Sequence, residues 1–301
     1  CFFAFTEMVD AASLAYNNRN SVTLLRRGPD EPWLGVQLVG SDPEHLRLAA
    51  DTINEYEFDV FDFNLGCPVP KVVRKHAGAA LGRGIDRALS CFALLAERVR
   101  FPLSAKIRIL DECDPAPTLA LVRGLAALGA RAVTIHGRVM EKFYSGPVHG
   151  AIIAECRRAV PVQIVANGGI MDVADCRTLR AETSCGPVMA ARGMMGNPWL
   201  FREIAEQDAF VPPTVAQWAE AMRLQVTEMC DLYGEFAGMR MARKIIMDYL
   251  RGRGFGGEAK NCASRLAART EFLAFCAGLE QSGPAESYWQ NSPATRRLRR
   301  S

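Results

Sequence analysis

FDVFDFNLGCPVPKVVRKHAGAALGRG, residues 58–84, places a cysteine in an unusual position. An apolar strand pattern ends in Asn64, and Cys67 follows between Gly66 and Pro68, at the start of a loop rich in Lys, Arg and Gly. A structural thiol is expected inside the strand, and a disulfide needs a partner cysteine. The position of Cys67 therefore asks for a functional explanation.

Short apolar runs alternate with longer amphipathic segments on both sides of this stretch, until about residue 198. Strands that alternate with helices pair in parallel through right-handed crossovers, so the pattern predicts an α/β fold with a parallel sheet. The expected strands are Phe2–Met8, Trp33–Val39, Phe58–Asn64, Leu103–Ile109, Ala132–His136, Val162–Ala166 and Pro187–Ala191. The expected helices between them are Pro43–Glu55, Ala88–Val99, Pro117–Leu128, Ala151–Ala159 and Val173–Arg180.

An open doubly wound sheet and a (β/α)8 TIM barrel both have this pattern. Polar residues end the strands one after another, and such a succession favours the barrel, in which all strand ends converge on one face. These ends are Glu7, Gln37, Asn64, Lys106–Arg108, His136–Arg138, Asn167–Gly169 and Arg192-Gly193. Only seven strand patterns are present, and the sequence opens on Cys1 within the first of them. We therefore expect a barrel whose first strand is missing from this sequence.

The sequence changes character after the last strand pattern. Val215–Leu232, Met239–Leu250 and Ala259–Leu279 have helical patterns, and Pro212-Pro213 marks a linker before them. We expect a barrel domain over residues 1–209, a small all-helical domain over 210–285, and a basic, disordered tail over 286–301.

Composition excludes several classes of protein. No apolar run is long enough for a transmembrane helix, no signal peptide is visible, and the ten cysteines contain no Cys-x-x-Cys pair. We expect a reduced, cytoplasmic, monomeric protein without a metal site. The net charge is +3, but the region from Phe236 to Ser301 holds twelve Lys or Arg and five Asp or Glu. This basic region is either a solvated helical surface or a binding surface for a polyanion.

Two strand ends have the glycine content of a phosphate site. Asn167–Gly169 and Arg192–Pro198 expose backbone N–H groups at turns, as phosphate sites of barrels do, although tight turns alone would also explain the glycines. Lys106 and His136 end strands that point toward the same mouth. A lysine beside a flavin stabilises negative charge on the reduced ring, and an imidazole can bind a ring or phosphate oxygen.

Taken in order, these segments resemble the tRNA-dihydrouridine synthase family, and most closely its bacterial B-type branch. Asn64–Pro68 is similar to the family's Asn-x-Gly-Cys-Pro segment, and the resemblance covers Phe2–Phe201 and, more weakly, the helices through Arg243-Lys244. The other similar segments are Thr6–Val9, Val36–Ser41, Val69–Val73, Lys106–Arg108, His136–Arg138, Tyr144–Pro147, Ala166–Gly168 and Arg192–Trp199.

The resemblance implies an enzyme that reduces specific uridines in tRNA to 5,6-dihydrouridine, with FMN at the barrel mouth and NADPH as the reductant. Hydride passes to C6 of the uracil, and Cys67 matches the family's general acid, which protonates C5. The implied cofactor contacts are Gln37 and Lys106 to the isoalloxazine ring, Asn64 to flavin or substrate, His136 to the flavin, and Asn167, Gly168, Arg192 and Gly193 to the phosphate. The implied RNA contacts are Lys71, Arg74, Lys75 and Arg138 at the mouth, which a solvated loop would equally explain, and Arg243 and Lys244 in the helices.

This chain also departs from the family pattern. The opening Pro-Met-x-Gly segment is absent, Ala191 and His76 stand where Gly is usual, and Gly82 stands where Leu is usual. Two alternative functions remain open: another FMN barrel reductase, such as a dihydroorotate dehydrogenase-like enzyme, and a non-catalytic RNA-binding remnant. Purified protein that carries a flavin would exclude the remnant.

Overall fold

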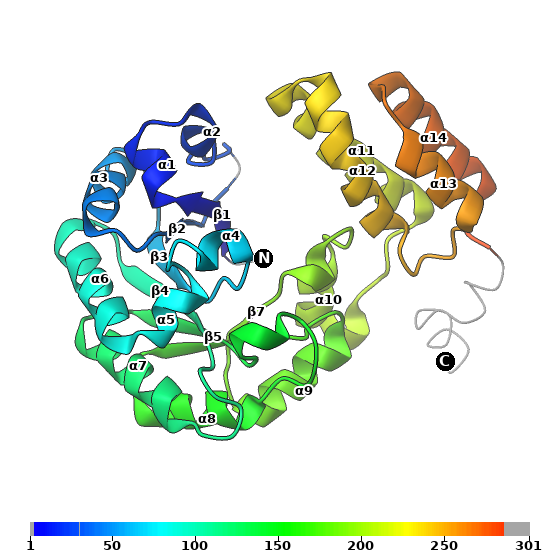
Figure 1. Cartoon of the computed structure of the whole chain (residues 1–301). Helices are drawn as coiled ribbons and strands as arrows, with labels where there is room; N and C mark the ends of the chain where they lie inside the picture. The colour runs from blue at the N-terminus through cyan, green and yellow to red at the C-terminus, as the bar shows by residue number, and fades with distance from the viewer. Residues whose placement is uncertain (1–2, 30, 286–301) are drawn as a thin grey trace. The chain divides into compact units, whose positions relative to one another are not determined.

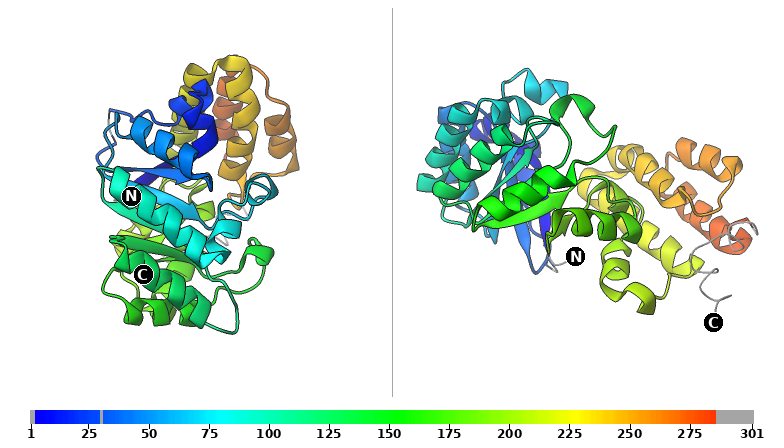
Figure 2. Two further views of the ribbon diagram at one scale, coloured as in Figure 1. Left: turned by 60° about the vertical axis from the view of Figure 1, so that its left-hand side comes forward. Right: turned by 90° about the horizontal axis from the view of Figure 1, so that it is seen from below.

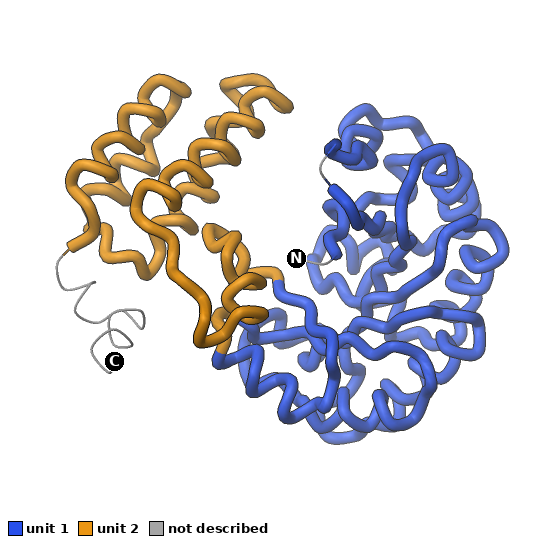
Figure 3. Tube along the Cα trace, turned by 180° about the vertical axis from the view of Figure 1, so that it is seen from behind, with its two compact units in different colours: residues 1–170, 174–190 blue, residues 171–173, 191–301 orange. Residues whose placement is uncertain are grey.

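A computed structural model describes residues 3–29 and 31–285 of the chain. By its contacts the chain divides into two compact units, shown in blue and orange in Figure 3. The first comprises residues 1–170 and 174–190, and the second residues 171–173 and 191–301. The tail expected at residues 286–301 lies outside the described residues.

The first unit is built on one parallel sheet, in which each strand pairs with its neighbours in sequence, in the order β1 to β7. A doubly wound sheet would reverse its strand order at a switch point, so the sequential order confirms the barrel-type α/β fold. The strands are β1 (Ala4–Asp10), β2 (Leu34–Val39), β3 (Val60–Leu65), β4 (Leu103–Arg108), β5 (Ala132–His136), β6 (Gln163–Asn167) and β7 (Val188–Met189). All seven expected strands are present within the described residues.

The sheet is curled, and helices cover its outer side, as Figures 1 and 2 show. The helices of this unit are α1 (Ala11–Ala15), α2 (Arg19–Thr23), α3 (Pro43–Ile53), α4 (Pro70–Val73), α5 (Ala79–Arg83), α6 (Ile85–Arg98), α7 (Ala116–Ala127), α8 (Gly150–Ala159) and α9 (Val173–Thr183). α3 starts where the sequence indicates, because the Asp42 carboxylate accepts a hydrogen bond from the backbone N–H of His45 and Pro43 occupies the first turn.

Strand β3 shows how the sheet separates apolar from polar side chains. Successive strand residues point to opposite faces. Phe61, Phe63 and Leu65 are at most 1% exposed, and they alternate with Asp62 and Asn64, which are hydrogen-bonded to polar groups of the neighbouring strands. One face of β3 therefore serves the core and the other carries the polar groups of the site.

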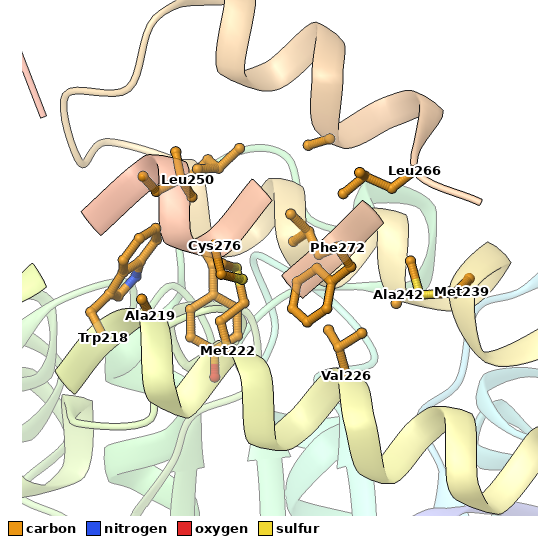
Figure 4. Packing of buried hydrophobic residues seen from close by; sticks show 14 of the residues in the cluster. Trp218, Ala219, Met222, Val226, Met239, Ala242, Leu250, Leu266, Phe272 and Cys276 are labelled. Carbon is orange, nitrogen blue, oxygen red and sulfur yellow. The ribbon is translucent and has the colours of Figure 1, made fainter. Parts of the chain in front are cut away.

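The second unit is helical. Its helices are α10 (Leu200–Glu206), α11 (Val215–Tyr233), α12 (Glu235–Leu250), α13 (Gly257–Arg265) and α14 (Arg269–Ser282). α11 begins at a capping box formed by Thr214 and Gln217, directly after Pro212-Pro213. Its apolar stripe, with Trp218, Met222 and Val226, packs against side chains of α12 and α14 in one core (Figure 4).

The single helix expected over Ala259–Leu279 is wrong, because the structure has two helices there. The Glu271 carboxylate accepts hydrogen bonds from the backbone N–H groups of Ala267 and Ala268, at 2.8 and 3.2 Å. Those bonds satisfy donors at the start of a new helix, α14. The helical spacing of the buried residues also changes here, because Leu266 and Phe272 lie six residues apart.

The contacts also assign the segment after Ala190 to the helical unit, whereas the sequence places it with the barrel up to residue 209. A Cβ atom at Gly196 would lie 2.3 Å from the backbone of Asp248 and Tyr249, and Arg253 donates a hydrogen bond to the Gly196 carbonyl at 2.9 Å. This loop packs directly on the end of α12. Among the described residues, no helix is both long and apolar enough to cross a membrane.

Candidate active site

Polar side chains gather at the carboxyl edge of the sheet, where five of the expected site residues lie: Gln37, Asn64, Lys106, His136 and Asn167. All strands are parallel, so their carboxyl ends share one edge. Asn64 lies opposite Lys106, and His136 opposite Asn167. The structure therefore brings these five residues to one edge, and the cofactor contacts expected of them remain a prediction.

Cys67 lies just beyond β3 on a loop whose backbone is fixed on both sides. The Asn64 side-chain oxygen Oδ1 accepts hydrogen bonds from the backbone N–H groups of Gly66 and Cys67, at 3.1 and 2.9 Å. The Cys67 carbonyl accepts one from the N–H of Ala79 at 3.0 Å. The Cys67 side chain is a free, partly exposed thiol. The loop thus presents the thiol from a constrained backbone.

Gly78 closes the other side of this loop. Its φ angle is +59°, and a Cβ atom there would lie 2.7 Å from the Cys67 carbonyl oxygen. Only glycine adopts this backbone conformation freely and also leaves room for that carbonyl.

Asp62 and Ser104 complete the site and were not among the residues expected from the sequence. The Asp62 carboxylate is 1% exposed, and it accepts hydrogen bonds from Gln37 Nε2 at 2.7 Å and from Ser104 Oγ at 2.6 Å. Gln37 Oε1 in turn accepts a hydrogen bond from Asn64 Nδ2 at 2.8 Å. A carboxylate in the middle of an apolar strand is the signal that could have identified Asp62, because such a group needs buried partners.

Burial shifts the pKa values of both Asp62 and Lys106. Burial raises the pKa of Asp62 to about 6, although the hydrogen bonds from Ser104 and Gln37 and the charge of Lys106 oppose that rise. Burial also lowers the pKa of Lys106 to about 8, against the attraction of Asp62. Lys106 Nζ donates a hydrogen bond to Asn167 Oδ1 at 3.0 Å. At neutral pH both groups carry their charges, and such perturbed pairs are common at functional sites.

Arg108 holds together the loops above the strands. It is 4% exposed, and its guanidinium donates hydrogen bonds to the carbonyls of Gly66 at 2.8 Å, Phe143 at 2.9 Å and Val139 at 3.2 Å. Desolvation lowers the pKa of Arg108 below its ordinary value. One buried guanidinium therefore ties the Cys67 loop to the loop after β5.

The backbone of Gly168 packs closely against the ring of His136, and both residues were expected at the cofactor. The φ angle of Gly168 is +125°, and a Cβ atom there would lie 2.7 Å from the His136 ring. Arg138, which was expected at the rim, is instead 7% exposed, and its guanidinium donates to the Gly146 carbonyl at 3.0 and 2.8 Å. Arg138 is therefore a buried loop-supporting residue in this structure, not a group on the rim.

The other basic residues expected near the mouth are exposed. Lys71 lies on α4, and Arg74 and Lys75 follow it. Lys75 forms an ion pair with Asp10 at 2.9 Å. Burial acts to raise the pKa of Asp10, but the hydrogen bonds from Lys75 and Ser13 outweigh it and lower that pKa. We call Lys71, Arg74 and Lys75 the basic loop.

The remaining expected residues belong to the helical unit. Arg192 and Gly193 form a short 3₁₀ turn (Arg192–Met194), in which Gly193 is buried. Arg243 is partly buried, and its Nε donates a hydrogen bond to the Leu266 carbonyl at 2.8 Å, whereas Lys244 is exposed. The expected roles of these four residues in phosphate and RNA binding stay predictions.

Sequentially paired parallel strands with a fixed thiol, a lysine and a buried carboxylate at their carboxyl edge define an enzyme of the TIM-barrel type. Sequence comparisons identify the family within that class. The model of the family described as "Dihydrouridine synthase (Dus)" matches residues 2–282. This chain belongs to the dihydrouridine synthase family.

Individual relatives agree with this assignment. A "Probable tRNA-dihydrouridine synthase" of Mycobacterium leprae is 34% identical over 264 residues, which cover 85% of this chain and 69% of the relative. The "tRNA-dihydrouridine synthase B" of Proteus vulgaris is 32% identical over 260 residues, with 85% and 78% covered. The corresponding B-type protein of Pasteurella multocida is 30% identical over 252 residues, with 82% and 76% covered. The expected family is confirmed, and B-type proteins are among its relatives.

Proposed function

We propose that this chain reduces uridines in tRNA to 5,6-dihydrouridine with bound FMN, and that NADPH is the reductant. Membership of the dihydrouridine synthase family and the names of the relatives support the reaction and the substrate. The observation that carries the proposal for this chain is the partly exposed thiol of Cys67, held at the carboxyl edge beside Asn64 and Lys106.

Cys67 is the proton donor in this proposal. Reduction of the uracil 5,6 double bond adds hydride at C6 and leaves negative charge that a proton at C5 must neutralise. Thiols are largely protonated at neutral pH, so a thiol can donate that proton directly. The Cys67 N–H donates to Asn64 Oδ1 and the Cys67 carbonyl accepts from the N–H of Ala79, so the backbone that carries the thiol is held in position for the transfer.

The residues at the carboxyl edge fit a flavin. The isoalloxazine ring carries carbonyl oxygens and ring nitrogens, and Lys106 has three N–H donors, of which one is hydrogen-bonded to Asn167. Gln37 and His136 offer further polar groups, and Asn167 and Gly168 would hold the phosphate. When bound, FMN would supply the hydride for uracil C6, with NADPH as the reductant.

Lys106 supplies positive charge at this edge of the site. Its pKa is lowered to about 8 by burial, so at neutral pH the ammonium group remains mostly protonated. A fixed cation of this kind stabilises negative charge on an adjacent ring without having to be moved during the reaction. Asp62 contributes to this state because its charge opposes the loss of the proton from Lys106.

The RNA contacts we propose are the basic loop and the exposed Lys244. Cationic side chains bind phosphates largely independently of base sequence, so they orient the tRNA but do not read it. The buried Arg138 supports the loop after β5, and the partly buried Arg243 fastens α12 to Leu266.

The test uses the full-length protein. Heat-released cofactor should chromatograph as FMN, and incubation with NADPH and an unmodified tRNA transcript should produce dihydrouridine, measured by mass spectrometry of the nucleosides. Flavin-bearing protein that leaves tRNA unchanged but reduces a small unsaturated substrate would indicate another FMN reductase. Protein that binds tRNA without flavin would indicate an RNA-binding remnant, and either result would contradict the proposal.

A further inference from the structure

A continuous chain of side-chain hydrogen bonds runs from the interior of the sheet to the backbone of Cys67. It starts with Ser104 Oγ, which donates to Asp62 at 2.6 Å, and continues from Gln37 Nε2 to Asp62 at 2.7 Å. Asn64 Nδ2 donates to Gln37 Oε1 at 2.8 Å, and Asn64 Oδ1 accepts from the Cys67 N–H at 2.9 Å. Three strands contribute to this chain, and it ends on the loop that presents the thiol.

The groups at the two ends of this hydrogen-bond chain determine how the amides of Gln37 and Asn64 are oriented. A carboxylate can only accept hydrogen bonds, so Gln37 must turn its NH₂ group toward Asp62 and its oxygen toward Asn64. The backbone N–H groups of Gly66 and Cys67 can only donate, so Asn64 must turn its oxygen toward them. Both amides satisfy their neighbours in a single pair of orientations, and that pair is the one in the structure.

We propose that Asp62 is a positioning residue, whose carboxylate orients the amides of Gln37 and Asn64 and thereby holds the backbone of Cys67 in place. The inference rests on the proposed role of Cys67 as proton donor. Asp62 acts through other residues, because its own oxygens are bonded to Gln37 on β2 and Ser104 on β4. Lys106 on β4 is the charged group that acts on it.

Protonation of Asp62 leaves this arrangement possible. A carboxyl O–H can donate to Ser104 Oγ, while the other oxygen still accepts from Gln37 Nε2. Gln37 and Asn64 then keep their orientations, and the N–H groups of Gly66 and Cys67 keep their acceptor. The hydrogen-bond chain therefore needs an acceptor at Asp62 that faces Gln37, and an apolar side chain there removes it.

The test measures how fast each cysteine reacts with N-ethylmaleimide, by mass spectrometry of the resulting peptides. Cys113 and Cys262 are exposed thiols and serve as internal references. In Asp62→Leu the reaction of Cys67 should accelerate by about threefold to tenfold relative to the references, as expected when a loop loses a hydrogen bond of ordinary strength.

Asp62→Asn is the matched control, because its amide can still accept from Gln37 and donate to Ser104 while it lacks the charge. Cys67 should therefore react at nearly the wild-type rate in Asp62→Asn, which separates amide orientation from any effect of charge on Lys106.

Gln37→Met provides a second route if Asp62→Leu does not fold, since it removes the middle link and leaves the buried carboxylate with Ser104. It should accelerate the reaction of Cys67 as Asp62→Leu does. Unchanged rates at Cys67 in the folded variants, or equal acceleration in Asp62→Leu and Asp62→Asn, would overturn the inference. The labelling rates are measured without flavin turnover and without tRNA. If the protein had no dihydrouridine synthase activity, the proposed function would be contradicted, but the labelling rates would still test the role of Asp62.

Discussion

At the scale of single residues, the proposed role of Cys67 as proton donor can be tested by substitution. Cys67→Ala should retain the fold, the flavin and its reduction by NADPH, because none of these needs a proton at uracil C5. Flavin reoxidation by tRNA should slow by roughly two to four orders of magnitude, the range for loss of a positioned acid. Cys67→Ser should recover little of the rate, since a hydroxyl is far less acidic than a thiol.

Stopped-flow absorbance of the flavin measures both half-reactions in the same sample. Reduction by NADPH is the internal control, and it should be equal in the wild type and both variants. If all three proteins were also reoxidised by tRNA at one rate, the thiol would be only structural and another group would protonate the base.

The buried negative charge of Asp62 should lower the free energy of unfolding of the protein. A carboxyl group whose pKa is raised from its ordinary 3.8 to about 6 stabilises the fold while protonated, and this contribution disappears as the pH rises through about 6. The amide introduced by Asp62→Asn does not titrate. The stability of the wild type relative to Asp62→Asn should therefore fall by up to about 3 kcal/mol between about pH 4 and pH 7.

Urea unfolding of both proteins at several pH values measures this difference. Asp62→Asn also removes the attraction that opposes the loss of the proton from Lys106, so the values between pH 4 and pH 6 report Asp62 most directly. A constant difference between pH 4 and pH 7 would mean that the pKa of Asp62 is the same in the folded and unfolded states.

At the scale of elements, α5 determines how closely the loop after Cys67 packs on β3. A Cβ atom at Gly82 would lie 2.5 Å from the Leu65 carbonyl oxygen, whereas at Gly84 the nearest atom would be 3.6 Å away. Gly82→Ala must push α5 from the end of β3 and should cost about 1–3 kcal/mol of stability, as overpacking does. It should also slow reoxidation by tRNA, because the Cys67 loop lies on the same strand end.

Gly84→Ala is the matched control for this prediction, because it is the same substitution two residues away with ordinary van der Waals contacts. Its stability, measured by thermal or urea unfolding, should stay within about 0.5 kcal/mol of the wild type. Equal losses in the two variants would show that α5 tolerates the shift and that the close approach at Gly82 has no role.

The strands and most helices were predictable because their signals are local. Apolar runs bounded by polar residues gave all seven strands, and Thr214 and Asp42 mark helix starts. The break between α13 and α14 was missed, because Glu271 caps two backbone N–H groups there and this cap has no apolar signal. His76, which stands where the family usually has Gly, has a φ angle of +53°, so the structure supplies the reason for that usual glycine.

The sequence predicted the site residues at the strand ends, but it did not predict those inside the strands. Asn64, Lys106 and Asn167 stand out as polar residues after apolar runs, whereas Asp62 and Ser104 lie within the runs, where a pattern of residue types cannot tell which neighbours they face. Arg138 shows the opposite error, because a charged residue after a strand looks exposed until the loop that covers it is known.

At the scale of the whole molecule, the basic helical region poses the question of tRNA binding. Arg243 and Lys244 are adjacent in sequence but differ in structure, because Arg243 is bonded to Leu266 and Lys244 is exposed. Charge reversal at Arg243 would disturb the helical unit itself. Lys244→Glu should weaken tRNA binding and lower the salt dependence of binding by about one phosphate contact, while the flavin content stays unchanged.

Filter binding at several salt concentrations measures this slope, and Lys260→Glu is the control. Lys260 lies on α13 in the same unit and gives the same change in net charge, so it reports the effect of overall charge alone. If both variants weakened binding equally, the basic region would act only through its net charge. If neither did, Lys244 would be a solvated surface residue, and the tRNA contacts would have to lie on the basic loop of the barrel, where Lys71 and Arg74 are the next residues to reverse.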